Sequence, residues 1–113
     1  MSGQYCQKLT PNQYSSFLEK NTGLVVIGYL STDLLASRQT QILVNTAQAM
    51  GGRARFAVLH PAYSAYFENA LKLEGSPTYL LFFSGVEQRR FLGAVDYEDL
   101  RELIYGPAGD VAV

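Results

Sequence analysis

Residues 76–85 read Ser76-Pro77-Thr78-Tyr79-Leu80-Leu81-Phe82-Phe83-Ser84-Gly85. The apolar run from Thr78 to Phe83 predicts a buried strand that opens directly after a proline, where the missing backbone N–H does no harm. Ser84-Gly85 predicts a turn, and Glu87 to Leu92 predict a second strand. Because so short a connection leaves no room for a crossover, the two strands are expected to form an antiparallel hairpin.

Three segments upstream of the hairpin are also predicted to be strands. Leu24 to Leu30 is an apolar, β-branched run without polar alternation, which is typical of a parallel strand covered on both faces. Arg53 to Leu59 is a second candidate for a buried strand, and Tyr5 to Leu9 is expected to form a short strand at the edge. The chain is therefore expected to contain a central sheet.

Helical patterns separate these strands. Thr10 and Gln13 form a capping-box signature around Pro11, which predicts a helix that stops at residues 21–23. A second helix, capped by one of residues 31–33, is expected to continue to Gly51-Gly52, and a third is expected to end near Gly75. Both faces of the sheet are thus expected to carry helices.

A last helix is predicted after the hairpin. Asp96, with Asp99 three residues further on, is expected to open this helix, which bears Tyr97, Leu100 and Ile104 on its apolar face. The domain is expected to span residues 1–105, and residues 106–113 are expected to form a flexible tail.

Composition and charge narrow the functional classes. The chain has 113 residues, of which 48% are hydrophobic and 17% charged, and this predicts one folded domain with a single core. The formal net charge is -1, and Arg53, Arg55, Arg89 and Arg90 are interpreted as a solvated face at one end of the sheet, so no nucleic-acid partner is expected. No signal peptide and no membrane-spanning run is recognised, which predicts a soluble, cytoplasmic protein without membrane partners.

The order of these elements, with a proline at the start of the terminal hairpin, resembles the thioredoxin fold over roughly Tyr5 to Tyr105. Residues 76–85 look like the cis-proline segment of that family, and Phe91-Leu92-Gly93-Ala94 looks like its closing strand. The resemblance implies an α/β, three-layer fold in which a central mixed sheet of four to five strands is flanked by helices. It also implies a C-terminal antiparallel hairpin followed by a helix.

The catalytic segment of the family is replaced in this chain. Thr32-Asp33-Leu34-Leu35-Ala36 stands where the family has Trp-Cys-Gly-Pro-Cys, so the resemblance puts Asp33 at the nucleophile and Ala36 at the resolving cysteine. Ile27 stands where many members keep a buried acid. Disulfide exchange needs a thiolate and a second thiol that resolves the mixed disulfide, so the chain is not expected to be an enzyme, and no cofactor is expected.

Several of these residues have two interpretations. Asp33 is interpreted as a helix cap, with a partner contact as the alternative. Pro77 is interpreted as a cis proline that lets Ser76 pair with an extended peptide, with a simple strand start as the alternative. Cys6, the only cysteine, is interpreted as a half-buried thiol, with intermolecular pairing or redox sensing as the alternative. No metal site is expected at His60, because no second histidine exists.

The leading hypothesis for function is a redox-inactive module that binds a protein or peptide client. Its predicted surface comprises Thr32 to Ala36, Ser76 to Thr78, and Gly93-Ala94. Hydrogenase-expression proteins with a thioredoxin-like fold also lack the cysteine pair, so an assembly chaperone is one specific form of this hypothesis. The alternatives are a residual redox role of Cys6, as a mixed disulfide or disulfide-linked dimer, and a self-associating subunit or homodimer that uses Leu34 and Leu35.

Overall fold

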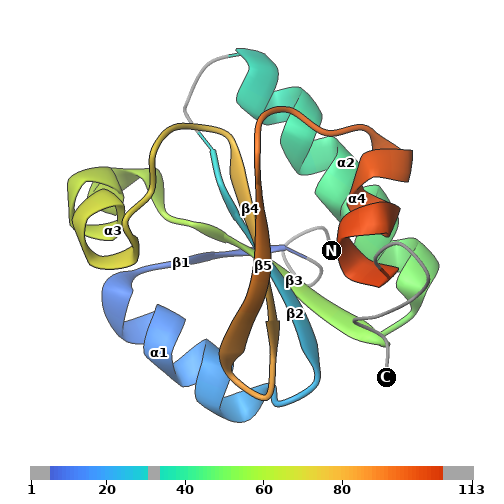
Figure 1. Cartoon of the computed structure of the whole chain (residues 1–113), viewed down its shortest axis with the longest axis horizontal. Coiled ribbons are helices and arrows are strands. Elements are labelled where there is room, and N and C mark those ends of the chain that lie inside the picture. The colour runs from blue at the N-terminus through green and yellow to red at the C-terminus, as the bar shows by residue number, and fades with distance from the viewer. Residues whose placement is uncertain (1–5, 31–33, 106–113) are drawn as a thin grey trace.

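The computed structural model describes residues 6–30 and 34–105, with side chains described outside positions 34 and 35. It contains a five-stranded sheet with helices on both faces (Figure 1). In chain order the elements are β1 (Gln7–Leu9), α1 (Pro11–Lys20), β2 (Leu24–Tyr29), α2 (Leu34–Met50), β3 (Ala54–Leu59), the 3₁₀ helix η2 (Pro61–Tyr63), α3 (Ser64–Leu71), β4 (Thr78–Phe83), β5 (Val86–Leu92) and α4 (Tyr97–Tyr105). The predicted tail, residues 106–113, lies outside the described residues.

The sheet is mixed, and its strand order is β1-β3-β2-β4-β5. Strands β1, β3 and β2 run parallel, because the helices α1 and α2 return the chain to the same end each time. β4 pairs antiparallel with β2, and β5 pairs antiparallel with β4. The predicted terminal hairpin and the predicted central position of β2 are both confirmed.

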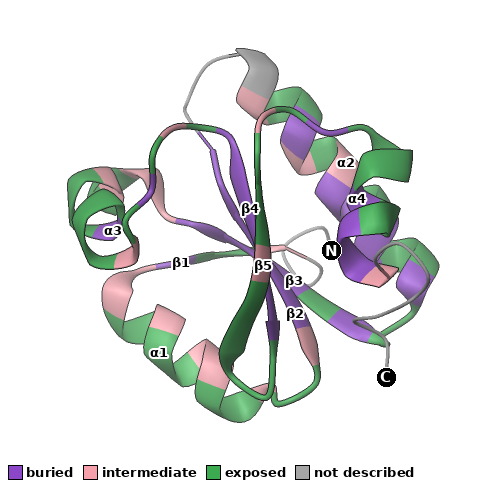
Figure 2. Ribbon diagram, viewed as in Figure 1, coloured by how far each residue is buried: buried purple, intermediate pink, exposed green. Residues whose placement is uncertain are grey.

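Each face of the sheet carries its own core. One core packs the sheet against α2 and α4 and includes Val26, Leu43 and Leu100. The other lies on the side of α1 and α3 and includes Val25, Ile27 and Phe67. Figure 2 shows burial concentrated in the central strands, between the helical layers. Alternate residues of β2 thus enter opposite cores, which explains why its sequence is apolar without interruption.

The helix ends follow the local signals in the sequence. Thr10 and Gln13 form a complete capping box at the start of α1, with Thr10 Oγ1 accepting from the Gln13 N–H at 3.4 Å. Asp96 and Asp99 cap each other's backbone N–H groups before α4, at 2.8 and 3.2 Å. His60 caps η2, because its Nδ1 accepts from the Ala62 N–H at 3.1 Å. The histidine therefore has a structural role.

Two expectations differ from the structure in detail. β1 begins at Gln7 and not at residue 5, so Cys6 lies just before the strand. Tyr97 was predicted on the apolar face of α4, but its side chain is 40% exposed and lies beneath the Arg101 guanidinium. Tyr97 occupies the first position of α4, and Leu103 belongs to the core in its place.

The four arginines also do not form one surface. Arg53 directly precedes β3, Arg55 is its second residue, and Arg89 and Arg90 lie on β5, so β2 and β4 separate the two pairs. Arg90 binds locally: it forms an ion pair with Glu87 at 2.7 Å and donates to the Leu71 carbonyl at the end of α3. Among the described helices, none is long and apolar enough to cross a membrane.

Candidate functional site

The centre of the predicted site is the peptide bond between Ser76 and Pro77, which is cis, as predicted. Pro77 is buried, whereas Ser76 is exposed. Thr78 is 2% exposed, and its hydroxyl donates to the Gly75 carbonyl at 2.6 Å. This bond fixes the turn before β4, so residues 75–78 form a short, well-anchored corner with Ser76 at its surface.

Gly93 and Ala94 lie beside this corner. The Gly93 N–H donates to the Pro77 carbonyl at 2.8 Å, one position beyond the pairing of Thr78 with Leu92. Gly93 has a φ of 122°, a conformation that a residue with a Cβ adopts only under strain. Ala94 follows it and is exposed. The structure therefore brings together the two segments that the sequence predicted as parts of one surface.

The Ser76 backbone is the unusual feature of this corner. Neither its N–H nor its C=O forms a hydrogen bond with any other described residue. Leu92 extends beside it, with a side chain that is 55% exposed and that lies close to Gly75. Backbone N–H and C=O groups without a partner, next to an exposed apolar side chain, are the groups that peptide recognition by strand addition uses.

The segment that replaces the catalytic motif is described only in part. Thr32 and Asp33 lie outside the described residues, so the predicted cap at Asp33 is neither confirmed nor contradicted. Leu34 and Leu35 open α2, but their side chains are not described. Ala36 is half-buried and packs against the core between the sheet and α2. Ile27, the counterpart of the buried acid, has no exposed surface and lies in the opposite core.

A buried polar cluster behind the corner was missed by sequence reasoning. Gln39 of α2 is 2% exposed; its Nε2 donates to the Val95 carbonyl at 3.0 Å, and its Oε1 accepts from the Val95 N–H at 2.9 Å. The hydroxyl of Tyr79 donates to the same Oε1. Burial, with a smaller contribution from Cys6, raises the pKa of Tyr79, so this hydroxyl stays protonated as a donor.

This Gln39 cluster ties three elements together. Gln39 belongs to α2, Tyr79 follows the corner on β4, and Val95 directly follows Gly93-Ala94. The segment that forms one wall of the surface is therefore held in place from behind. One signal in the sequence did exist: a glutamine occupies the position four residues before Leu43 on the face of α2 that was expected to be apolar.

Gly28 makes room for this arrangement. A Cβ at Gly28 would lie 3.2 Å from Leu43 Cδ1 and 3.3 Å from Tyr79 Cε1. The tyrosine ring therefore lies close to the backbone of β2, and a larger residue at position 28 would fit only if Leu43 and Tyr79 shifted.

Cys6 lies apart from the corner in the chain and is half-buried. Burial raises the pKa of the Cys6 thiol from 9.0 to about 12, so it is uncharged at neutral pH. The thiolate is the reactive species in disulfide exchange and metal binding, so burial lowers the fraction of Cys6 that can react at a given pH. No group of His, Cys, Asp and Glu side chains within the described ranges has the arrangement of a metal site.

Comparison with solved structures agrees with this topology. Mitochondrial thioredoxin 3 from Saccharomyces cerevisiae, in its oxidized form, superposes with a TM-score of 0.76 at 20% identity, covering 92% of this chain and 97% of that chain. Chloroplastic thioredoxin z superposes with a TM-score of 0.76 at 16% identity, covering 88% and 90% of the two chains. A mutant thioredoxin from Halobacterium salinarum NRC-1 superposes with a TM-score of 0.73 at 18% identity, covering 86% and 87%.

The fold is thioredoxin-like. At these identities the likeness concerns the fold alone, and the sequence matches neither a protein-family model nor a curated protein. The chain has one cysteine and therefore no Cys-x-x-Cys pair. The protein thus has a thioredoxin-like fold and a cis proline directly before β4, but it lacks the two thiols that disulfide exchange requires.

Proposed function

We propose that this thioredoxin-like protein is a non-catalytic module that binds an extended segment of a protein client. The binding surface comprises Ser76 and Gly93-Ala94, together with residues 32–36, and the buried Pro77 and Thr78 anchor the corner that presents Ser76. The observation that carries the proposal is the exposed Ser76 backbone, whose N–H and C=O have no partner among the described residues.

The chemistry of the corner favours strand addition. A client in the extended conformation would accept from the Ser76 N–H and donate to its C=O, while Leu92 offers an apolar contact beside this pair. Gly93 and Ala94 carry little or no side chain, so a backbone can approach closely. The Gln39 cluster holds this wall in one conformation, and a preformed surface lowers the ordering cost of binding.

An assembly chaperone in the cytoplasm, such as one for hydrogenase maturation, is a more specific form of this proposal. Its support is the analogy of fold with loss of the cysteine pair, and fold alone does not determine function. A redox role of Cys6 is disfavoured, because burial keeps the thiol protonated at neutral pH. Self-association through Leu34 and Leu35 remains a prediction that sedimentation of wild type and Leu34→Asp would test.

Photo-crosslinking from defined positions tests the proposed surface. A photoreactive amino acid replaces Ser76 in one variant and Ala94 in another, and Ser15, an exposed serine on α1, serves as the matched control position. We expect both surface positions to crosslink the same protein in cells, and the control position to leave that protein uncrosslinked.

A blocking substitution completes this experiment. Ala94→Arg places a long charged side chain on the surface and should abolish the crosslink from position 76. Ala49→Arg makes the same change at an exposed position near the far end of α2 and should leave the crosslink intact. Equal crosslinking from all three positions, or a crosslink that survives Ala94→Arg, would contradict the proposal.

A further inference from the structure

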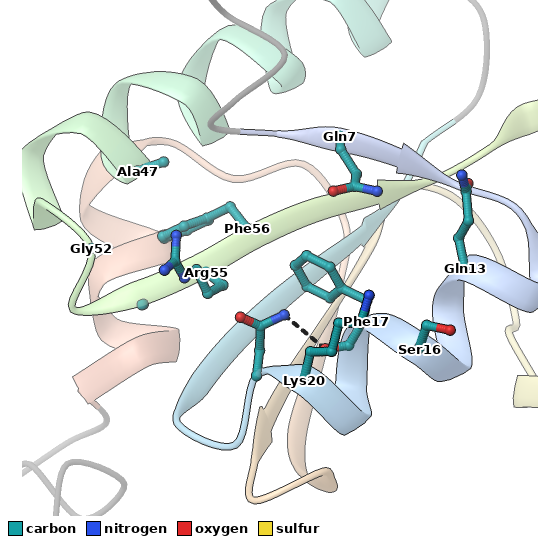
Figure 3. Close-up of a pocket in the computed structure, with 11 residues that line it drawn as sticks. Gln7, Gln13, Ser16, Phe17, Lys20, Ala47, Gly52, Arg55 and Phe56 are labelled. Atoms are coloured by element: carbon teal, nitrogen blue, oxygen red, sulfur yellow. Dashed lines mark hydrogen bonds between the residues drawn. The ribbon is translucent and has the colours of Figure 1, made fainter.

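A groove of about 660 Å³ lies at the β1 side of the sheet, between α1 and the first residues of β3 (Figure 3). α1 contributes Gln13, Ser16, Phe17 and Lys20 to its lining, and β3 contributes Ala54 to Phe56. Strand β1 pairs with β3 only at Ala57–Leu59, so the part of β3 that lines the groove lies beyond this pairing.

The groove is separate from the Ser76 corner. Ala54, at the groove, pairs with Leu24 at the start of β2, whereas Thr78, at the corner, pairs with Tyr29 at its end. The two features therefore lie at opposite ends of the central strands, and nothing in the proposed function involves the groove.

The polar lining consists of cations and neutral groups. Lys20 and Arg55 are exposed cations, and the lining includes no aspartate or glutamate. Neither cation forms an ion pair with a described residue; the ion pair found within the described ranges joins Arg90 and Glu87. Two positive charges thus face a groove that supplies no counter-charge of its own.

The amide groups add donors to these charges. Gln13 uses its Oε1 to accept from the Thr10 N–H at 2.9 Å in the capping box, so its NH₂ group is the part left for a ligand. Gln7 reaches the groove from β1 and adds a second amide (Figure 3). A ligand that fits this lining is rich in acceptors and negatively charged.

Apolar groups form the rest of the groove. Phe56 and Ala47 are buried, and Phe17 is half-buried with its ring toward the groove (Figure 3). Lys20 lies in the last turn of α1 and Arg55 lies on β3, so the two cations come from different elements. A peptide that carries carboxylates among apolar residues could pair with the two cations and also contact the apolar part of the groove.

From this lining we infer that the groove binds an extended peptide segment of a partner protein in which Asp or Glu alternates with apolar residues. The carboxylates pair with Lys20 and Arg55, and the apolar side chains cover the half-buried Phe17. Charge complementarity of this kind determines specificity and association rate more than it determines affinity.

An NMR titration of the ¹⁵N-labelled protein tests this inference. The probe is a blocked hexapeptide of alternating Glu and Val, and the control peptide replaces each Glu with Gln. We expect the Glu peptide to shift the amide signals of Phe17, Lys20, Arg55 and Phe56, to bind more weakly as salt is added, and to bind at least about tenfold more tightly than the Gln peptide.

Two charge-reversal variants make the test specific. Lys20→Glu/Arg55→Glu should lose this binding, whereas Arg38→Glu/Arg101→Glu changes the net charge equally at exposed positions outside the groove and should keep it. All four side chains are exposed, and the spectrum of each free variant verifies its fold.

Four results would overturn the inference: equal binding of both peptides, equal loss in both variants, shifts confined to Ser76 and Gly93, or the same shifts with inorganic phosphate alone. The third result would place the peptide at the corner and leave the proposed function standing. The fourth would identify the groove as a site for small anions.

Discussion

Replacing Gln39 with leucine removes a side chain that joins α2, β4 and the segment before α4. Leucine has a similar volume, so the packing around Tyr79 is largely kept. Three buried groups lose their partner: the Val95 N–H, the Val95 C=O and the Tyr79 hydroxyl. The free energy of unfolding is therefore expected to fall mainly because these buried polar groups are left without hydrogen-bond partners.

The size of this fall follows from the number of groups left unpaired. A buried donor or acceptor without a partner costs about 1–3 kcal/mol, so three of them at the low end of this range cost about 3–5 kcal/mol. A domain of this size has a total stability of about 5–15 kcal/mol, so Gln39→Leu would remove a large part of it. The Gly93-Ala94 wall would lose its support at the same time.

Tyr79→Phe serves as the matched comparison. It deletes only the hydroxyl, and Gln39 Oε1 still accepts from the Val95 N–H, so the expected loss is about 1 kcal/mol. In the Gln39→Leu background, Tyr79→Phe removes a buried hydroxyl that already has no hydrogen-bond partner. The double variant should therefore be less destabilised than the sum of the single variants, by about 2–3 kcal/mol.

Urea unfolding followed by far-UV circular dichroism measures these differences. The chain contains no tryptophan, so the usual fluorescence signal is absent and backbone ellipticity is the better probe. The reasoning would be refuted if Gln39→Leu were no less stable than Tyr79→Phe, or if the two substitutions added without coupling.

Four further predictions concern Gly28 and Cys6. Gly28→Ala should lower the free energy of unfolding by about 1–3 kcal/mol, because its Cβ would approach Leu43 and Tyr79 at 3.2 and 3.3 Å; unchanged urea denaturation would show that these side chains move aside freely. Cys6 should react slowly with Ellman's reagent at pH 8 in the folded chain and rapidly in urea, and equal rates would contradict its burial. The pKa of the Cys6 thiol rises from 9.0 in the unfolded chain to about 12 in the folded one, so the thiol ionises first in the unfolded state. Wild type should therefore lose more stability than Cys6→Ala as the pH rises from 9.0 to about 12. Insulin reduction by dithiothreitol should proceed at the same rate with and without the protein, and an acceleration that Cys6→Ser abolishes would revive the redox hypothesis.

The local signals in the sequence determined the order of the elements. Thr10 and Gln13 define the start of α1 through groups three residues apart, and the continuous apolar run of residues 24–30 identified the central strand. The cis bond before Pro77 and its proximity to Gly93 were predicted through a family resemblance, and both are confirmed. The contact of this corner with Asp33 stays a prediction.

Only the tertiary structure decided what lies behind and beside that corner. Gln39 is 40 residues from Tyr79 and 56 residues from Val95 in the chain, so no local sequence pattern predicts their hydrogen bonds. The groove likewise takes its two cations from α1 and β3, which only the order of strands in the sheet brings together. Hydrophobic periodicity and helix caps depend on residues that are close in sequence. Hydrogen bonds between buried polar groups of distant elements depend on how those elements pack.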